Sequence, residues 1–210
     1  MIPIVNAFST KERIVLAGER LFARHGLHGV SLRQIGAEAG NRNHYAVQYH
    51  FGTRERLIQA IFEYRMRRLY ERQETLIAGR RPEDLRCWVD CYLLPILEQG
   101  EREGSHYLTF VAMLRQHRRS DLFEGLPEEF QTSTRVFRER VAELLPHVPE
   151  PLRAYRISQA LLIGVHAAAD REQSRARREG VLSFTHYVSD VIDGIAGFLA
   201  APVSRAARGR

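Results

Sequence analysis

The stretch SLRQIGAEAGNRNHYAVQYHFGTRER, residues 31–56, decides the fold of this chain. It opens with Ser31 three positions before Gln34, which is the pattern of a capping box at the start of a helix. Apolar residues then recur with the spacing of one buried helical face. Gly40 and Asn41, which both tolerate positive φ, predict a tight turn after this first helix.

A second short helix is predicted over residues 44–50, with Asn43 able to cap it. Within it, only Ala46 and Val47 are plainly apolar. A helix that is too polar for a core, but lies between apolar helices, presents its side chains to a partner. Two short helices joined by a glycine turn form a helix-turn-helix, whose second helix enters the major groove of DNA.

The same residues resemble the DNA-binding head of the TetR family of bacterial transcriptional repressors. LFARHG (residues 21–26) is similar to the end of the helix that precedes the family's motif, and SLRQIGAEAG (residues 31–40) is similar to its first motif helix. YHFGTRE (residues 49–55) is similar to its signature tyrosine, histidine and phenylalanine and the start of its fourth helix. Two features depart from the commonest family pattern: the turn over residues 40–43 is one residue longer, and Arg54 stands where a lysine is usual.

The candidate DNA-binding residues lie in and around the second motif helix. Glutamine can pair with adenine in the major groove, and tyrosine hydroxyls commonly reach phosphate. The resemblance assigns Tyr49 and His50 to the phosphate backbone, which leaves the earlier residues of the helix for bases, while Phe51 is expected to pack inward. The alternative is a merely solvated helix with plain surface charges around it. The full set is Ser31, Arg33, Arg42, Asn43, His44, Tyr45, Ala46, Gln48, Tyr49, His50 and Arg54.

The charge is concentrated at one end of the chain. The net charge is +6, and residues 1–56 hold eight Lys and Arg against four Glu, which gives this segment +4. A basic head on a near-neutral body is the expected footprint of a nucleic-acid binder, although charge alone fits a solvated surface equally well.

Composition indicates a cytoplasmic globular protein. The chain has 210 residues, of which 44% are hydrophobic and 27% charged, which is ordinary for such proteins. We expect no membrane association, since no apolar run approaches the ~20 residues of a membrane span, and the N-terminal sequence lacks the basic region of a secretory signal. Cys87 and Cys91 lie four positions apart, which suits one helix face and argues against a disulfide framework.

The rest of the chain reads as helices, so the predicted class is all-α with about nine helices. Helices are expected over residues 9–25 and 53–78, from residue 82 onward, and over residues 105–117, 127–145, 151–170 and 181–200. Pro95 is expected to kink or end its helix, and residues 171–180 to form an exposed loop. The predicted domains are a helix-turn-helix head (residues 1–52), an effector-binding and dimerisation body (residues 53–201) and a disordered basic tail (residues 202–210).

Large or polar side chains recur on the apolar helices of the body. The simplest interpretation is core packing; the alternative is a mostly apolar ligand pocket with a few polar groups. The resemblance favours a pocket, because repressors of this family usually bind a small effector there. The candidate ligand-binding residues are Trp88, Tyr92, Phe110, Met113, His117, Phe130, Phe137 and His166.

The last two expected helices carry apolar residues together with small ones that permit close helix approach. Internal packing alone would explain them. In the resembled family these helices form a four-helix bundle with a second subunit, and a two-fold dimer suits a pseudo-palindromic operator. The candidate interface residues are Leu161, Val165, Val188, Val191, Ile195 and Phe198.

No cofactor, metal or catalytic site is predicted. The His and Cys residues form no four-ligand set with zinc-site spacing, and the common nucleotide-binding and hydrolase motifs are missing from the sequence. The leading hypothesis is therefore a dimeric repressor that binds operator DNA and is released by a small-molecule effector. The alternatives are a helical small-molecule-binding or structural protein without operator specificity and, more weakly, an enzyme.

Overall fold

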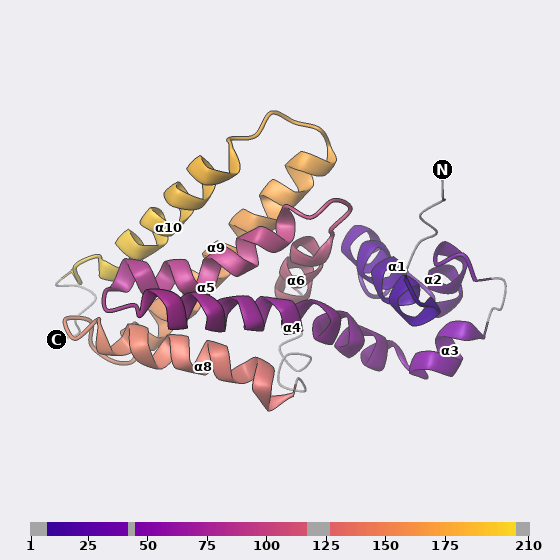
Figure 1. Ribbon diagram of the computed structural model, residues 1–210, viewed down its shortest axis with the longest axis horizontal. Coiled ribbons are helices and arrows are strands. Elements are labelled where there is room, and N and C mark those ends of the chain that lie inside the picture. The colour runs from indigo at the N-terminus through magenta and orange to yellow at the C-terminus, as the bar shows by residue number, and fades with distance from the viewer. Residues whose placement is uncertain (1–7, 42–44, 117–126, 205–210) are drawn as a thin grey trace. The chain divides into compact units, whose positions relative to one another are not determined.

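The computed structural model describes residues 8–41, 45–116 and 127–204. These residues form nine helices and no strand (Figure 1), which confirms the predicted all-α class. In chain order the helices are α1 (Thr10–His25), α2 (Leu32–Glu38), α3 (Ala46–Phe51), α4 (Arg54–Arg80), α5 (Leu85–Gly100), α6 (Tyr107–Gln116), α8 (Glu128–Glu143), α9 (Leu152–Ala176) and α10 (Phe184–Ala200).

Several residues assigned to sites or to the tail fall outside the described part of the chain. These are Arg42, Asn43, His44, His117 and residues 205–210. Phe130 lies in α8, but its side chain is likewise outside the description.

The chain divides into two compact units. Unit 1 comprises Met1–Met66 and Phe110–Leu126, and unit 2 comprises Arg67–Thr109 and Pro127–Arg210. Helices α4 and α6 each contribute residues to both units. The predicted functional division after residue 52 stays a prediction.

Local capping fixes the helix starts in unit 1. Ser9 and Glu12 form a reciprocal capping box at α1, and the box predicted for Ser31 and Gln34 is present at α2. In α2, the Gln34 amide oxygen accepts from the Ser31 N–H at 2.8 Å, and the Ser31 hydroxyl accepts from the Gln34 N–H at 3.2 Å. At the start of α4, the Thr53 hydroxyl accepts from the Arg56 N–H at 3.2 Å, which is the contact of a helix N-cap.

The core of unit 1 holds α2 and α3 close together. A Cβ atom added to Gly36 in α2 would lie 3.3 Å from the Val47 side chain of α3, so only a residue without a side chain allows this approach without a shift. Phe22, Phe62 and Phe110 are fully buried and pack with ring centroids 5.6 to 6.2 Å apart. This aromatic packing joins α1, α4 and α6 within unit 1.

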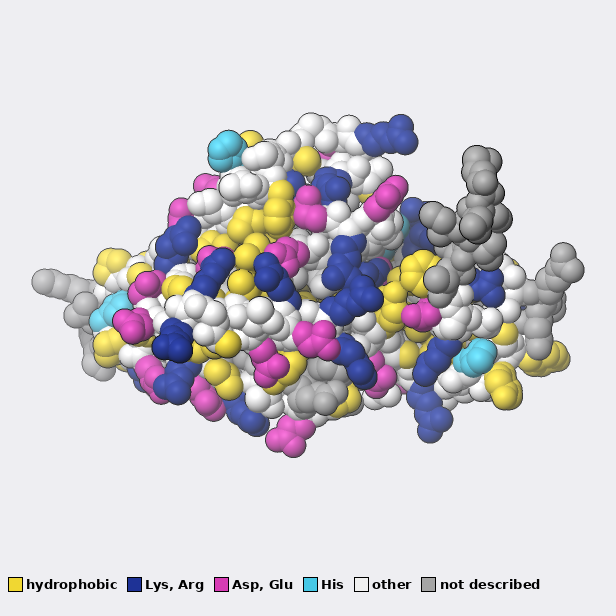
Figure 2. All heavy atoms as spheres, in the orientation of Figure 1, with side chains coloured by type: hydrophobic (Ala, Val, Ile, Leu, Met, Phe, Trp, Pro, Cys, Tyr) yellow, Lys and Arg dark blue, Asp and Glu magenta, His cyan; other side chains and the backbone are white. Residues whose placement is uncertain are grey.

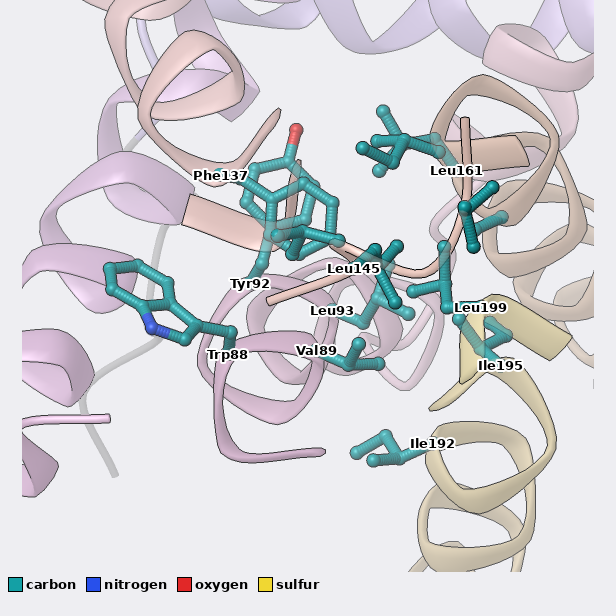
Figure 3. Packing of buried hydrophobic residues seen from close by; sticks show 14 of the residues in the cluster. Trp88, Val89, Tyr92, Leu93, Phe137, Leu145, Leu161, Ile192, Ile195 and Leu199 are labelled. Atoms are coloured by element: carbon teal, nitrogen blue, oxygen red, sulfur yellow. The ribbon is translucent and has the colours of Figure 1, made fainter. Parts of the chain in front are cut away.

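The core of unit 2 is a cluster of buried apolar residues drawn from α5, α8, α9 and α10 (Figure 3). Tyr92 of α5 stacks on Phe137 of α8, with ring centroids 4.3 Å apart. On the face shown in Figure 2, Lys and Arg side chains are interspersed with Asp and Glu side chains over this unit, which agrees with the near-neutral charge of the body. The face of unit 2 that is shown therefore has no large surface area of a single charge sign.

Helix α5 continues through Pro95 and ends at Gly100, so the proline does not terminate it. The helix begins one turn later than Pro82, because Asp84 caps it by accepting from the Cys87 N–H at 2.8 Å.

The exposed loop predicted for residues 171–180 is confirmed only for residues 177–180, which follow the helix and are exposed. Helix α9 runs to Ala176, and Arg171 and Glu172 are buried. Arg171 pairs with Glu101 at 2.7 Å, while the Glu172 carboxylate accepts from the Thr109 N–H and hydroxyl at 2.8 Å each. Charged residues enter a core when each finds a partner, and those partners lie 63 to 70 positions away along the chain.

Candidate DNA-binding surface and ligand hollow

The outward face of α3 consists of Tyr45, Gln48, Tyr49 and His50, all of which are exposed. Tyr45 and Tyr49 keep 75% and 85% of their surface in solvent, which is unusual for large aromatic side chains. The Tyr49 and His50 rings meet edge to face at 5.2 Å. This face offers phenol, amide and imidazole groups to a partner.

The opposite face of α3 anchors the helix. Ala46, Val47 and Phe51 are buried, at 7%, 1% and 4% exposure. Phe51 thus packs inward as predicted. Ala46, a candidate for base contact, lies on this inward face and away from the exposed side chains.

The charged and hydroxyl candidates around α3 differ in how they are held. Arg33 is exposed, and Ser31 caps α2. Arg54 is half-buried, and its Nη2 donates to the Val30 carbonyl at 2.9 Å. Arg54 therefore supports the loop before α2, which the sequence pattern did not indicate.

Lys11 is a DNA-binding candidate that the sequence analysis missed. Its ammonium nitrogen lies 5.9 Å from the centre of the Phe51 ring, at the end of α3, and the residue is exposed. The available signal was a lone lysine in the first turn of α1, but only the tertiary structure brings it beside the Phe51 ring at the end of α3. A cation here adds to the attraction for phosphate.

The described candidate ligand-binding residues lie in both units and differ in burial. Tyr92 and Phe137 meet in the core of unit 2, and the Tyr92 hydroxyl lies 2.7 Å from the Thr134 hydroxyl. Phe110 belongs to the core of unit 1, Met113 is half-buried in α6, and His166 is exposed on α9.

Trp88 borders an open hollow of ≈ 620 Å³ in unit 2. In Figure 3 the indole lies to one side of the stacked Tyr92 and Phe137 rings. Apolar side chains and four charged residues share the lining, which suits a ligand with both apolar and polar parts. The lining residues are Ile77, Arg81, Pro82, Glu83, Trp88, Val136, Arg140, Glu143 and Leu144.

Polar side chains also enter the interior of unit 2. Gln73 is 1% exposed; its amide nitrogen donates to the Tyr92 carbonyl at 2.8 Å, and its amide oxygen accepts from the Ser133 hydroxyl at 2.5 Å. These bonds tie α4 to α5 and α8. This network could not be predicted from the sequence, since a single glutamine on a long helix usually faces solvent.

The candidate dimer residues divide between the core and the surface. Leu161, Val165 and Ile195 are buried within the chain itself, at 5%, 7% and 2% exposure. Val188 and Val191 are half-buried, and Phe198 is exposed.

The sequence analysis missed the exposed apolar residues of α9. Tyr155 and Ile163 keep 62% and 43% of their surface in solvent. On α10, a Cβ added to Gly194 or Gly197 would meet nothing within 4 Å, so open space borders both glycines. Exposed apolar side chains on α9 and uncovered glycines on α10 are features on which another helix can pack closely.

Neither a metal cluster nor a membrane-spanning helix is found in the part of the chain that the structure covers. No three or more His, Cys, Asp or Glu side chains within the described ranges are grouped to hold a metal ion. None of the described helices is both long and apolar enough to cross a membrane.

Two family profiles match this chain. Residues 14–61 match the profile described as bacterial regulatory proteins, tetR family, and residues 90–201 match the one described as tetracyclin repressor-like, C-terminal domain. Comparison with curated proteins gave no match.

Solved structures of regulators share the fold at low sequence identity. A putative tetR family transcription regulator from Shewanella sp. PV-4 has a TM-score of 0.61 at 15% identity, over 90% of this chain and 97% of its own. A transcriptional regulator from Rhodococcus sp. has a TM-score of 0.57 at 19% identity, over 91% and 96%. A TetR-family regulator from Streptomyces coelicolor has a TM-score of 0.56 at 17% identity, over 90% and 94%.

Proposed function

Because this chain belongs to the TetR family of bacterial regulatory proteins and is therefore a DNA-binding transcription regulator, we propose that it is a cytoplasmic repressor whose dimer binds a pseudo-palindromic operator and is released by a small-molecule effector. The observation that carries the proposal is the outward face of α3, where Tyr45, Gln48, Tyr49 and His50 are exposed on a helix whose other face is buried. A helix held in this way can enter a major groove.

Binding to DNA combines two kinds of contact. Tyr49, His50 and Lys11 supply groups for phosphate, while Tyr45 and Gln48 supply groups for base edges. Phosphate contacts set the affinity and its dependence on salt, and base contacts set the choice of operator.

The effector site that the structure favours is the hollow beside Trp88. A volume of ≈ 620 Å³ is within the range of small-molecule pockets, and its lining mixes apolar and charged side chains. Release of DNA requires that the effector binds the free form of the dimer more tightly than the DNA-bound form.

The dimer surface that we propose comprises the exposed side chains Tyr155, Ile163 and Phe198 together with Gly194 and Gly197. Two copies of this surface, related by a two-fold axis, would pack α9 and α10 against their counterparts. A symmetric pair of α3 helices would then read two half-sites of opposite orientation.

The decisive experiment measures binding to a random duplex and to a duplex selected from a random pool, each across a salt series. We expect steep salt dependence for both and much tighter binding to the selected sequence, which should contain an inverted repeat. A helical small-molecule-binding or structural protein without operator specificity would instead show no enrichment of any sequence.

Trp88 allows the effector proposal to be tested separately. It is the only tryptophan, so its fluorescence reports on the hollow without interference from another indole. Compounds that change this fluorescence should also release the selected duplex, with a coupling of about 1–3 kcal/mol, or roughly 5- to 150-fold in affinity. Trp88→Ala should lower the affinity for the effector and leave DNA binding without effector nearly unchanged. Trp88→Phe should retain part of the release of DNA by the effector. An unchanged effector response in Trp88→Ala would place the pocket elsewhere.

A further inference from the structure

Helix α5 carries the only two cysteines of the chain, Cys87 and Cys91, which are both free thiols. Residues four apart on a helix lie on one face, with Cβ atoms about 5–6 Å apart. Cys87 is half-buried and Cys91 is fully buried. Burial raises the pKa of the Cys91 thiol to about 11, and the charge of Cys87 and a hydrogen bond with it add to the rise. Both thiols therefore lie on one side of α5, one turn apart.

The geometry of this pair disfavours a disulfide. An unstrained disulfide brings its two Cβ atoms to about 3.5–4.5 Å, closer than the spacing of roughly 5–6 Å on a helix. A thiophilic atom bound to both sulfurs replaces the single S–S bond by two longer bonds. A zinc–sulfur bond, for comparison, is about 2.3 Å long. Such an atom bridges the pair without distorting α5.

Only two thiols are available here, and this number decides which thiophilic atom fits the pair. Metal ions that prefer four thiolate or imidazole ligands need more than this pair, and the described residues contain no group of three or more suitable side chains. A trivalent arsenical with one organic substituent, R–As(OH)₂, has two exchangeable positions and needs two thiols only. Two isolated, adjacent thiols fit that requirement.

The helix is weakened at the point where the second bond must form. Cys91 has no exposed surface, so its sulfur becomes accessible only when its turn opens. Pro95 lies four residues later and has no N–H, so the helical hydrogen bond to the Cys91 carbonyl cannot form. The next carbonyl, that of Tyr92, accepts from the Gln73 side chain at 2.8 Å. Local opening is easier where a helix lacks a backbone hydrogen bond.

We propose that Cys87 and Cys91 form a two-thiol site for monosubstituted trivalent arsenicals. Each thiol displaces one hydroxyl group from arsenic: two S–H and two As–O bonds break, two As–S bonds form, and two water molecules leave with the thiol protons. Arsenic and sulfur keep their oxidation states. Arg80 of α4 pairs with Asp90, between the two cysteines along the chain, so the site lies where α4 and α5 of unit 2 meet.

The test uses phenylarsine oxide with the full chain under native conditions and intact-mass measurement, in the absence of DNA. We expect one phenylarsenic group per chain, retained in excess glutathione and removed by a dithiol such as dimercaptopropanol. Cys87→Ser, Cys91→Ser and Cys91→Ala should each bind at least about 100-fold more weakly, because the second bond is no longer intramolecular.

A matched control keeps two thiols but separates them. In Arg86→Cys combined with Cys87→Ser, the new thiol takes the place of a side chain that is 50% exposed, and it lies five positions from Cys91. This variant should lose retention in glutathione, while circular dichroism confirms that it is folded. The proposal is overturned by any of three results: a wild-type chain that binds only in denaturant, a single-cysteine variant that retains the arsenical as wild type does, or an adduct that joins two chains.

Discussion

The Arg65 guanidinium donates two hydrogen bonds, each 2.7 Å long, to the Glu19 carboxylate. Their side chains are 7% and 1% exposed, so the pair is buried between α4 and α1 within unit 1. Two parallel bonds from a planar guanidinium fix orientation as well as distance. This pair therefore fixes the packing of α1 on α4 beside the helix-turn-helix.

Removing one partner of this pair should destabilise unit 1 strongly. Glu19→Ala leaves the buried Arg65 charge without its bidentate partner, and we expect a loss of about 3–5 kcal/mol in the free energy of unfolding. Glu19→Leu combined with Arg65→Met should lose less, since neither charge remains buried. Urea unfolding of the three proteins measures the difference. If Glu19→Ala unfolds at the wild-type urea concentration, the pair has no such role.

Tyr49→Phe should weaken binding to the selected and the random duplex by the same factor. A phosphate contact carries no sequence information, and one hydrogen bond of about 0.5–1.5 kcal/mol corresponds to roughly 2- to 13-fold. Fluorescence anisotropy at fixed salt measures both affinities. Tyr70→Phe is the matched control, because Tyr70 is also a tyrosine but lies on the part of α4 that belongs to unit 2, outside every surface proposed for DNA or for the dimer. A loss confined to the selected duplex would show that Tyr49 reads bases.

Ile163→Glu and Phe198→Glu should each give soluble, folded monomers. Both side chains are exposed in the single chain, so a charge is tolerated there until a second subunit covers it. Light scattering measures the mass, and Leu182→Glu, at a residue 63% exposed just before α10, should remain dimeric. Should both variants stay dimeric, another surface joins the subunits.

Ile195→Glu should behave differently from these surface variants. Ile195 is 2% exposed and packs in the core of unit 2, so a buried carboxylate should unfold that unit instead of separating intact subunits. Thermal unfolding followed by circular dichroism distinguishes the two outcomes. A folded Ile195→Glu monomer would contradict the placement of this residue in the core.

Stability should fall at alkaline pH through Tyr187. Burial raises the pKa of its phenol from 10.0 to about 12, against the lowering effect of Arg171, whose guanidinium lies 4.5 Å from the ring. Because the folded chain keeps the proton more tightly, the unfolding free energy should decrease as pH rises from about 10 to about 12. Tyr187→Phe should reduce this decrease, because the variant has no phenol at this position. If the unfolding free energy falls equally steeply with pH in wild type and in Tyr187→Phe, Tyr187 does not cause the loss of stability.

The sequence by itself determined the helix-turn-helix and the all-α class. Capping boxes at Ser9 and Ser31 depend on residues three positions apart, and the polarity of residues 44–50 is visible in the sequence. Such short-range patterns can be read from the sequence, because the groups that form hydrogen bonds with one another are only a few residues apart.

Only the tertiary structure decided which apolar residues face inward. Helical spacing selected Leu161 and Ile195 for an interface, but they pack within unit 2, while Ile163 and Phe198 stay exposed. Likewise, the charges of Arg171 and Glu172 suggested a loop, but both residues lie in α9 and bind Glu101 and Thr109, which are far away in the sequence. Periodicity shows that a helix has an apolar face, but the contacts that cover that face come from segments far away in sequence, whose packing the local pattern does not specify.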